Sequence, residues 1–95
     1  TVVHLAAIVS PGRDVDLEYR VDVTGAAHVL AACVETGVRR IVVSSSGAAY
    51  GYHRDNPAWI DEDQPLRGND AFPYSRHKRL VEEMLAGYRE SHPAL

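Results

Sequence analysis

Two short apolar runs lie on either side of one long stretch with helical periodicity, and this order constrains the fold more than any other feature of the chain. The runs lie near residues 2–8 and at residues 39–45, and the helical stretch covers about residues 14–35, after a loop at residues 10–12. Short runs rich in valine and isoleucine indicate buried strands, whereas apolar positions three and four residues apart indicate a helix. Because a helix separates them, the two strands are predicted to be parallel neighbours in an α/β sheet.

A second helix is predicted over about residues 73–90, after a polar loop at residues 46–71. Pro73 suits its first turn, where the missing N–H costs nothing. Structureless loops as long as this one are uncommon unless they are functional or disordered. The resulting βαβα order has too few helices to cover both faces of a parallel sheet, so we expect a fragment of a larger domain. The apolar stripe of the second helix is His77, Val81, Met84, Leu85 and Tyr88.

Composition excludes several classes of protein. The 95 residues contain 10 Lys and Arg against 13 Asp and Glu, a net charge of −3, which argues against a nucleic-acid partner. Cys33 is the only cysteine, so an intrachain disulfide or a cysteine-based zinc cluster is not possible. The five histidines lack metal-ligand spacing, so we expect no metal. Without an apolar run of membrane-spanning length or a signal peptide, we expect a soluble, cytoplasmic protein with no membrane partner.

Tyr74 and Lys78 are four residues apart on the second predicted helix, so their side chains share a face. A tyrosine with the usual pKa near 10 is a poor acid or base at neutral pH, but a neighbouring ammonium favours its phenolate. The pair is therefore a candidate acid/base device. Taken alone, the spacing favours a simpler interpretation, an exposed aromatic–lysine pair.

A run of three serines, residues 44–46, lies at the carboxyl end of the second predicted strand, where parallel sheets commonly bind their ligands. A serine there can hydrogen-bond an oxygen whose proton the tyrosine handles. We expect Ser46 to have this role, and Ser44 and Ser45 to close the strand through their backbone groups. In the long loop, Trp59 is predicted either to contact a ligand or to anchor the loop on the body of the protein.

Four segments of the chain match motifs of one family, in the order in which that family has them. With them, the chain resembles the extended short-chain dehydrogenases/reductases, the NAD-dependent epimerase/dehydratase group. The second segment resembles the family's N-V-x-G motif, the third its S-S-x-x-x-Y-G strand end, and the fourth its Y-x-x-x-K motif. The first looks like the family's fourth strand, whose small residues let the backbone pass close to the dinucleotide. These segments are Val3–Ala7, Tyr19–Gly25, Ser44–Gly51 and Tyr74–Lys78.

The resemblance implies a partial Rossmann-like βαβα unit with parallel strands and a role for each site residue. Tyr74 would be the general acid/base, Lys78 would hold the nicotinamide ribose and lower the tyrosine pKa, and Ser46 would orient the reacting oxygen. The cofactor would be NAD or NADP. The residues expected to contact it are Ala6, Ala7, Ser44, Tyr74 and Lys78.

The chain departs from the family pattern in three respects. Asp22 stands where the family has an asparagine, and a carboxylate cannot donate a hydrogen bond as an amide does. The family's glycine-rich, pyrophosphate-binding turn is missing. Ser46 and Ala48 replace the threonine and acidic residue usual in the dehydratases, which disfavours that activity. We therefore expect residues 1–95 to be the central portion of an NAD(P)-binding domain, without its first βαβ half and its C-terminal substrate region.

The function predicted from these residues is an NAD(P)-dependent oxidoreductase or epimerase that acts on the hydroxyl or carbonyl group of a small molecule, with a nucleotide sugar as one candidate. We expect the isolated chain to be inactive. The resemblance also implies a homodimer formed through the two helices. The alternative is a non-catalytic interaction or dimerisation module that keeps the same fold. The helix residues available for such a contact are Val21, His28, Val29, Ala32, Leu80 and Met84.

Overall fold

The two strands pair in parallel, as the strand–helix–strand order predicts. β1 (Val2–His4) and β2 (Ile41–Val43) are in register, with Val2 opposite Ile41 and His4 opposite Val43. The structure, a computed structural model, describes residues 1–10 and 12–95. The loop expected at residues 10–12 therefore lies partly outside the described residues, at Pro11.

Both strands are shorter than the sequence predicts, because their ladder ends at the same point. The expected strands cover residues 2–8 and 39–45, whereas each observed strand has three residues. The last bond between the two segments runs from the Ser44 N–H to the His4 carbonyl, at 3.1 Å. Beyond it, the Ile8 N–H binds the side chain of Asp22 at 2.7 Å, so this segment turns towards a helix.

The first helical stretch is continuous but not uniform. It consists of α1 (Val15–Tyr19), a π-helical segment (Arg20–Thr24) and α2 (Gly25–Glu35), close to the predicted range of 14–35. Asp14 caps its start by accepting a hydrogen bond from the Leu17 N–H at 2.9 Å. Gly37 follows its end with a φ of 69°, a conformation that favours glycine.

The second helix, α3 (Pro73–Ser91), has almost the predicted bounds, and Pro73 lies in its first turn. The loop before it contains an element that the sequence did not predict, a 3₁₀-helix at Gly47–Tyr50. No helix in the described residues is both long and apolar enough to cross a membrane.

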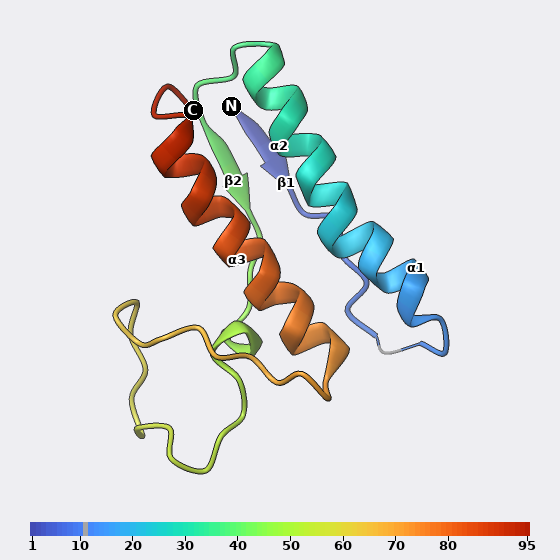
Figure 1. The fold of residues 1–95 in the computed structure, drawn as a ribbon, viewed down its shortest axis with the longest axis vertical. Coiled ribbons are helices and arrows are strands. Elements are labelled where there is room, and N and C mark those ends of the chain that lie inside the picture. The colour runs from blue at the N-terminus through green and yellow to red at the C-terminus, as the bar shows by residue number, and fades with distance from the viewer. Residues whose placement is uncertain (11) are drawn as a thin grey trace.

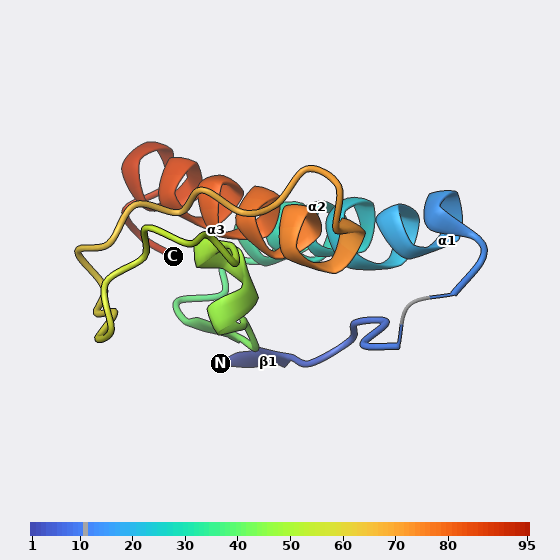
Figure 2. The same cartoon turned by 90° about the horizontal axis from the view of Figure 1, so that it is seen from below.

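The helices form one layer over the strand pair (Figure 1), and the side view in Figure 2 shows both α2 and α3 on the same side of β1. The core between these layers contains Val23, Ala26 and Val81, with Val43 and Met84 packed against them. In the described part of the chain nothing covers the other face of the strands, where Val3 and Val42 are exposed. As predicted, two helices cover only one face.

Candidate active site

Lys78 joins α3 to the carboxyl end of the parallel strands. Its Nζ atom donates a hydrogen bond to the backbone carbonyl of Ser44, directly after β2, at 3.0 Å. The residue is only 6% exposed. A buried ammonium is costly unless it is bonded. Its position therefore ties α3 firmly to the strand edge at which sheets of this type bind ligands.

Tyr74 lies beside this ammonium, as their spacing on α3 predicts. The Lys78 Nζ atom is 5.6 Å from the centroid of the Tyr74 ring, within the range of a cation–π contact. The ring is half-buried, and Phe72 lies against it with a centroid distance of 6.2 Å. The interpretation as an exposed aromatic–lysine pair is therefore wrong, since Lys78 is buried.

Ser44 and Lys78 share a crevice with Ala6 and Ala7, which follow β1. Four of the five residues expected to contact a cofactor therefore meet at one place, and Tyr74 adjoins it through Lys78. The crevice measures only about 10 Å³, which is enough for about one water molecule. It is therefore the floor of a site and not a complete pocket.

Ser46, two residues after Ser44, faces a different and larger hollow. The hollow measures about 550 Å³ and is lined by Ser46, Tyr50, Glu62 and Arg89, among others. The Ser46 hydroxyl oxygen accepts a hydrogen bond from the Ala48 N–H at 3.1 Å and so caps the 3₁₀-helix. Its hydroxyl proton remains available to a ligand. By contrast, Ser44 closes the strand through its backbone, as expected.

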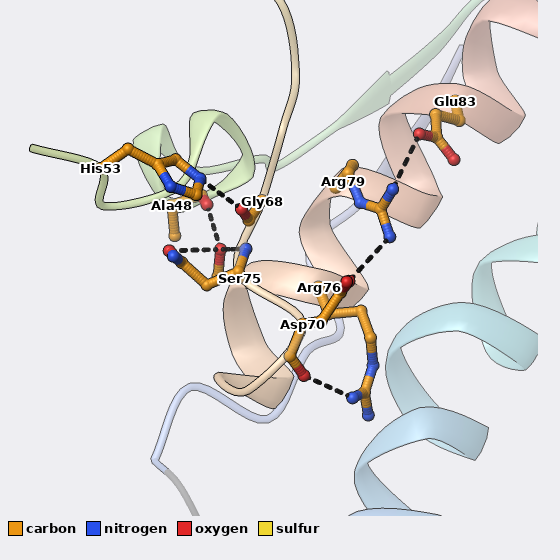
Figure 3. A network of polar contacts seen from close by, with 9 residues as sticks. Ala48, His53, Gly68, Asp70, Ser75, Arg76, Arg79 and Glu83 are labelled. Carbon is orange, nitrogen blue, oxygen red and sulfur yellow. Dashed lines mark hydrogen bonds and ion pairs between the residues drawn. The ribbon is translucent and has the colours of Figure 1, made fainter. Parts of the chain in front are cut away.

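Ser75 holds the start of α3 to the loop that carries Ser46. This completely buried hydroxyl donates to the Ala48 carbonyl at 2.6 Å and accepts from the Asn69 N–H at 2.8 Å. Figure 3 shows this contact beside the bond between His53 and the Gly68 carbonyl. Ser75 was not among the predicted site residues, although its position between Tyr74 and Lys78 places it on the same helix as both.

The other end of the long loop is also bound to α3, through its charged side chains. Arg76 donates to the Asp70 carbonyl at 2.8 Å, and Arg79 forms ion pairs with Asp70 and Glu83 (Figure 3). Trp59 does not help to anchor the loop, because it is 92% exposed. The anchoring role considered for Trp59 is therefore wrong.

A buried acid–base pair lies behind the crevice and was not predicted as a unit. The Asp22 carboxylate accepts the Ile8 N–H with one oxygen, and its other oxygen is 3.7 Å from Nδ1 of His77. The sequence gives one signal for it. Asp22 lies three residues after Tyr19 and four before Ala26, on the apolar face of its helix, where a charged residue is unusual.

The pKa of His77 is lowered from its ordinary value, mainly because burial disfavours the charged ring and also because Arg76 is nearby. The carboxylates of Asp22 and Glu18 oppose this change without cancelling it. The His77 ring is therefore neutral at neutral pH. An edge-to-face contact with Tyr19, at a centroid distance of 5.5 Å, completes its surroundings.

The residues of the site fit one end of a dinucleotide. An ammonium has three donors, and Lys78 uses one of them on Ser44 among the described residues, which leaves two for ligand hydroxyl groups such as those of a ribose. Ala6 and Ala7 place no bulky side chain at the crevice. No glycine-rich turn for a pyrophosphate is present in this sequence. The described residues therefore offer donors suited to ribose hydroxyl groups.

A parallel β–α–β unit, with a tyrosine and a lysine one helical turn apart at the carboxyl edge of its strands, is a partial Rossmann-like arrangement of the short-chain dehydrogenase/reductase type. The chain belongs to the NAD dependent epimerase/dehydratase family, whose pattern matches residues 1–95.

Individual relatives agree with this membership. The chain is 40% identical over 98 residues to the N-acetyl-alpha-D-glucosaminyl-diphospho-ditrans,octacis-undecaprenol 4-epimerase of Escherichia coli O157:H7, covering 98% of this chain and 27% of the relative. It is 35% identical over 89 residues to the UDP-glucose 4-epimerase of Homo sapiens, covering 88% and 24%. The chain thus spans about a quarter of the length of these curated relatives.

Solved structures show the same fold. A short-chain dehydrogenase/reductase superfamily protein from Agrobacterium tumefaciens with bound NAD superposes with a TM-score of 0.78 at 36% identity, covering 94% of this chain and 27% of that one. The UDP-glucose 4-epimerase from Brucella ovis in complex with NAD gives a TM-score of 0.81 at 32% identity, covering 98% and 28%. The predicted family and fold class are therefore confirmed.

Proposed function

We propose that the protein carrying this chain is an NAD-dependent 4-epimerase of a sugar joined to a diphosphate. The buried Lys78 ammonium carries this proposal, because it lies under the Tyr74 ring at the carboxyl edge of the strands. A module that only binds another protein has no physical need for a buried charge at that place. The two curated relatives described above are named as 4-epimerases of such sugars.

Tyr74 moves the proton in this proposal. Its oxygen takes the proton of the sugar hydroxyl while the carbon is oxidised to a ketone, and it returns the proton when the ketone is reduced from the opposite face. The positive charge of Lys78 favours the phenolate form that accepts the proton. The hydride acceptor and donor that these steps need would be supplied by bound NAD.

Ser46 orients the sugar oxygen during these steps. Its own oxygen is held by the Ala48 N–H, so the direction of its hydroxyl proton is restricted before the substrate binds. Lys78 binds the ribose hydroxyls of NAD with its two remaining donors, and Ala6, Ala7 and Ser44 form the surface beneath them. NADP and a simple oxidoreductase reaction are the alternatives to this assignment.

Two further parts of the proposal concern the assembly and the isolated chain. Two copies of the protein pair through α2 and α3, where His28 and Ala32 are exposed and Leu80 and Met84 are half-buried. The chain alone does not turn over substrate, because it has no glycine-rich turn to bind the pyrophosphate. We further propose that the complete protein works in the cytoplasm.

Tyr74→Phe in the complete protein tests the proposed function. The change removes the oxygen that carries the proton, so we expect kcat with UDP-glucose or UDP-N-acetylglucosamine to fall by about 10²–10⁴-fold. Tyr88→Phe is the matched control on the same helix, because its ring lies against His92 and away from Lys78. If Tyr74→Phe turns over both sugars as fast as Tyr88→Phe does, the proposed function is wrong.

A further inference from the structure

The Asp22 carboxylate connects the segment after β1 with the helix that carries Tyr74 and Lys78. One oxygen accepts the Ile8 N–H at 2.7 Å, and the other lies 3.7 Å from Nδ1 of His77 on α3. Asp22 is 5% exposed and His77 is 1% exposed, so water does not separate them from their neighbours. Two distant parts of the chain are therefore held by one buried carboxylate.

The hydrogen-bonding capacity of these groups favours one arrangement. An ionised carboxylate offers acceptors alone, whereas a neutral imidazole has one N–H and one bare nitrogen. Since His77 is neutral, its proton must be on Nδ1 if the ring is to face Asp22 favourably. The 3.7 Å separation exceeds that of a hydrogen bond, so the two groups interact as a charge facing a polar N–H.

The rest of the His77 environment does not favour the other tautomer. Both ring nitrogens are buried without a hydrogen-bond partner among the described residues, and no acceptor is recorded near Nε2, whereas Nδ1 faces Asp22. The charged groups near the ring are Glu18 and Asp22 from the first helical stretch and Arg76 from its own helix. Tyr19 presents an edge-to-face ring contact. Of the two carboxylates, Asp22 is the one with an oxygen within 4 Å of a ring nitrogen, so it is the group placed to fix the position of the ring proton.

The same carboxylate shapes the floor of the proposed cofactor site. Asp22 lines the crevice together with Ala6, Ala7 and Lys78. If the bond to Ile8 is lost, nothing else in the described structure holds the Ile8 N–H against the helices. The segment that carries Ala6 and Ala7 can then move away from Lys78, and the crevice opens.

We infer that Asp22 and His77 are positioning residues, which hold the segment 6–8 against α3 with His77 in its Nδ1–H tautomer. This inference rests on the proposed function for its consequence, because the segment and Lys78 together form the nicotinamide side of the site. Neither residue touches the reacting atoms. Their contribution is to NAD binding more than to the chemical step.

The ring tautomer is measured by ¹⁵N NMR of histidine-labelled complete protein, with His77→Gln used to assign the signals. We expect the Nδ1–H form in the original protein. In Asp22→Asn, the amide oxygen must still accept from Ile8, so the amide nitrogen faces His77 and donates to Nδ1. The ring proton is then expected to move to Nε2. The exposed His28 serves as the internal control and does not change.

An Nε2–H ring or an imidazolium at neutral pH in the original protein would overturn the inference, as would a tautomer that Asp22→Asn leaves unchanged. None of these readouts depends on enzyme activity. Tyr74→Phe is expected to abolish turnover without altering the tautomer, so the failure of the proposed function and the failure of this inference give different results.

The effect on NAD binding is measured by titration of the complete protein with NAD. Asp22→Ala removes a buried hydrogen bond to a charged group, so we expect the Kd for NAD to rise by about tenfold to a hundredfold. Asp22→Asn keeps the bond to Ile8 and is expected to restore affinity to within a few fold. Equal affinities for Asp22→Ala and the original protein would contradict the positioning role, and if Asp22→Ala does not fold, Asp22→Asn with the tautomer measurement still decides it.

Discussion

The two halves of α3 belong to one continuous helix but are held in different ways. The first half contains all of the helix's buried residues, Ser75, His77, Lys78 and Val81, and three of these are polar. The second half, from Glu82 to Ser91, has no buried residue, and its exposed Ser91 hydroxyl bonds to the Gly87 carbonyl one turn away and to the ring of the neighbouring His92. Burying polar groups costs free energy. The contrast therefore marks the first half as the part of the helix that organises a site and the second as support.

Replacing a charged residue in each half of α3 should give the largest difference in enzyme activity between them. In the complete protein, Lys78→Met removes the ammonium beside Tyr74, and we expect kcat/KM of the proposed reaction to fall by about a hundredfold to a thousandfold. Glu90→Gln, at an exposed charged residue in the second half, should change kcat/KM less than twofold. Steady-state kinetics with both variants measures this, and similar losses in the two variants would remove the distinction between the halves.

The serines of α3 give a matched pair for stability. Ser75→Ala leaves the Ala48 carbonyl and the Asn69 N–H without their buried partner, at a cost of about 2–4 kcal/mol of unfolding free energy. Ser91→Ala removes a similar bond at the exposed end and should cost less than about 0.5 kcal/mol. Urea unfolding of the complete protein compares them. Equal costs would show that burial does not set the value of these bonds.

A smaller effect is expected from pH, through His77. Because its pKa is lower in the folded protein than in the unfolded chain, the unfolded chain binds more protons below about pH 6.5. Stability is therefore expected to fall as the pH is lowered from 7 towards 5, and His77→Phe should remove part of this slope. His92→Gln, at a half-buried position directly after α3, should leave it unchanged. The unfolding free energy of the original protein and of both variants, measured across this pH range, tests this expectation. A slope that His77→Phe leaves unchanged would contradict it.

Local patterns in the sequence were sufficient for the helices, for the parallel strand pair and for the contact between Tyr74 and Lys78. These features depend on spacing within one element or on the order of elements along the chain. The strand lengths were wrong because they depend on a partner, and the ladder ends where Ile8 binds Asp22. The 3₁₀-helix at Gly47–Tyr50 was missed, since four residues are too few to show a period.

The contacts made by Ser75, Asp22 and His77 could not be predicted for a different reason. Ser75 bonds across to Ala48, and Asp22 faces His77 from another helix, so these contacts exist only after the elements have packed. A buried serine and a buried histidine in a helical stripe look the same in sequence whether they bond or merely pack. Family membership could be inferred from motifs because each motif is local.

The π-helical segment Arg20–Thr24 sets the phase of the whole first helical stretch. A π-turn contains one residue more than an α-helical turn, so deleting a residue there would rotate everything beyond it by about 100° relative to α1. Glu18 would then no longer lie on the same side as Ala26 and Leu30, which are buried with it now. This turn therefore sets which side of α1 and which side of α2 face the core together. An insertion or deletion of one residue in it would alter the site more than most substitutions.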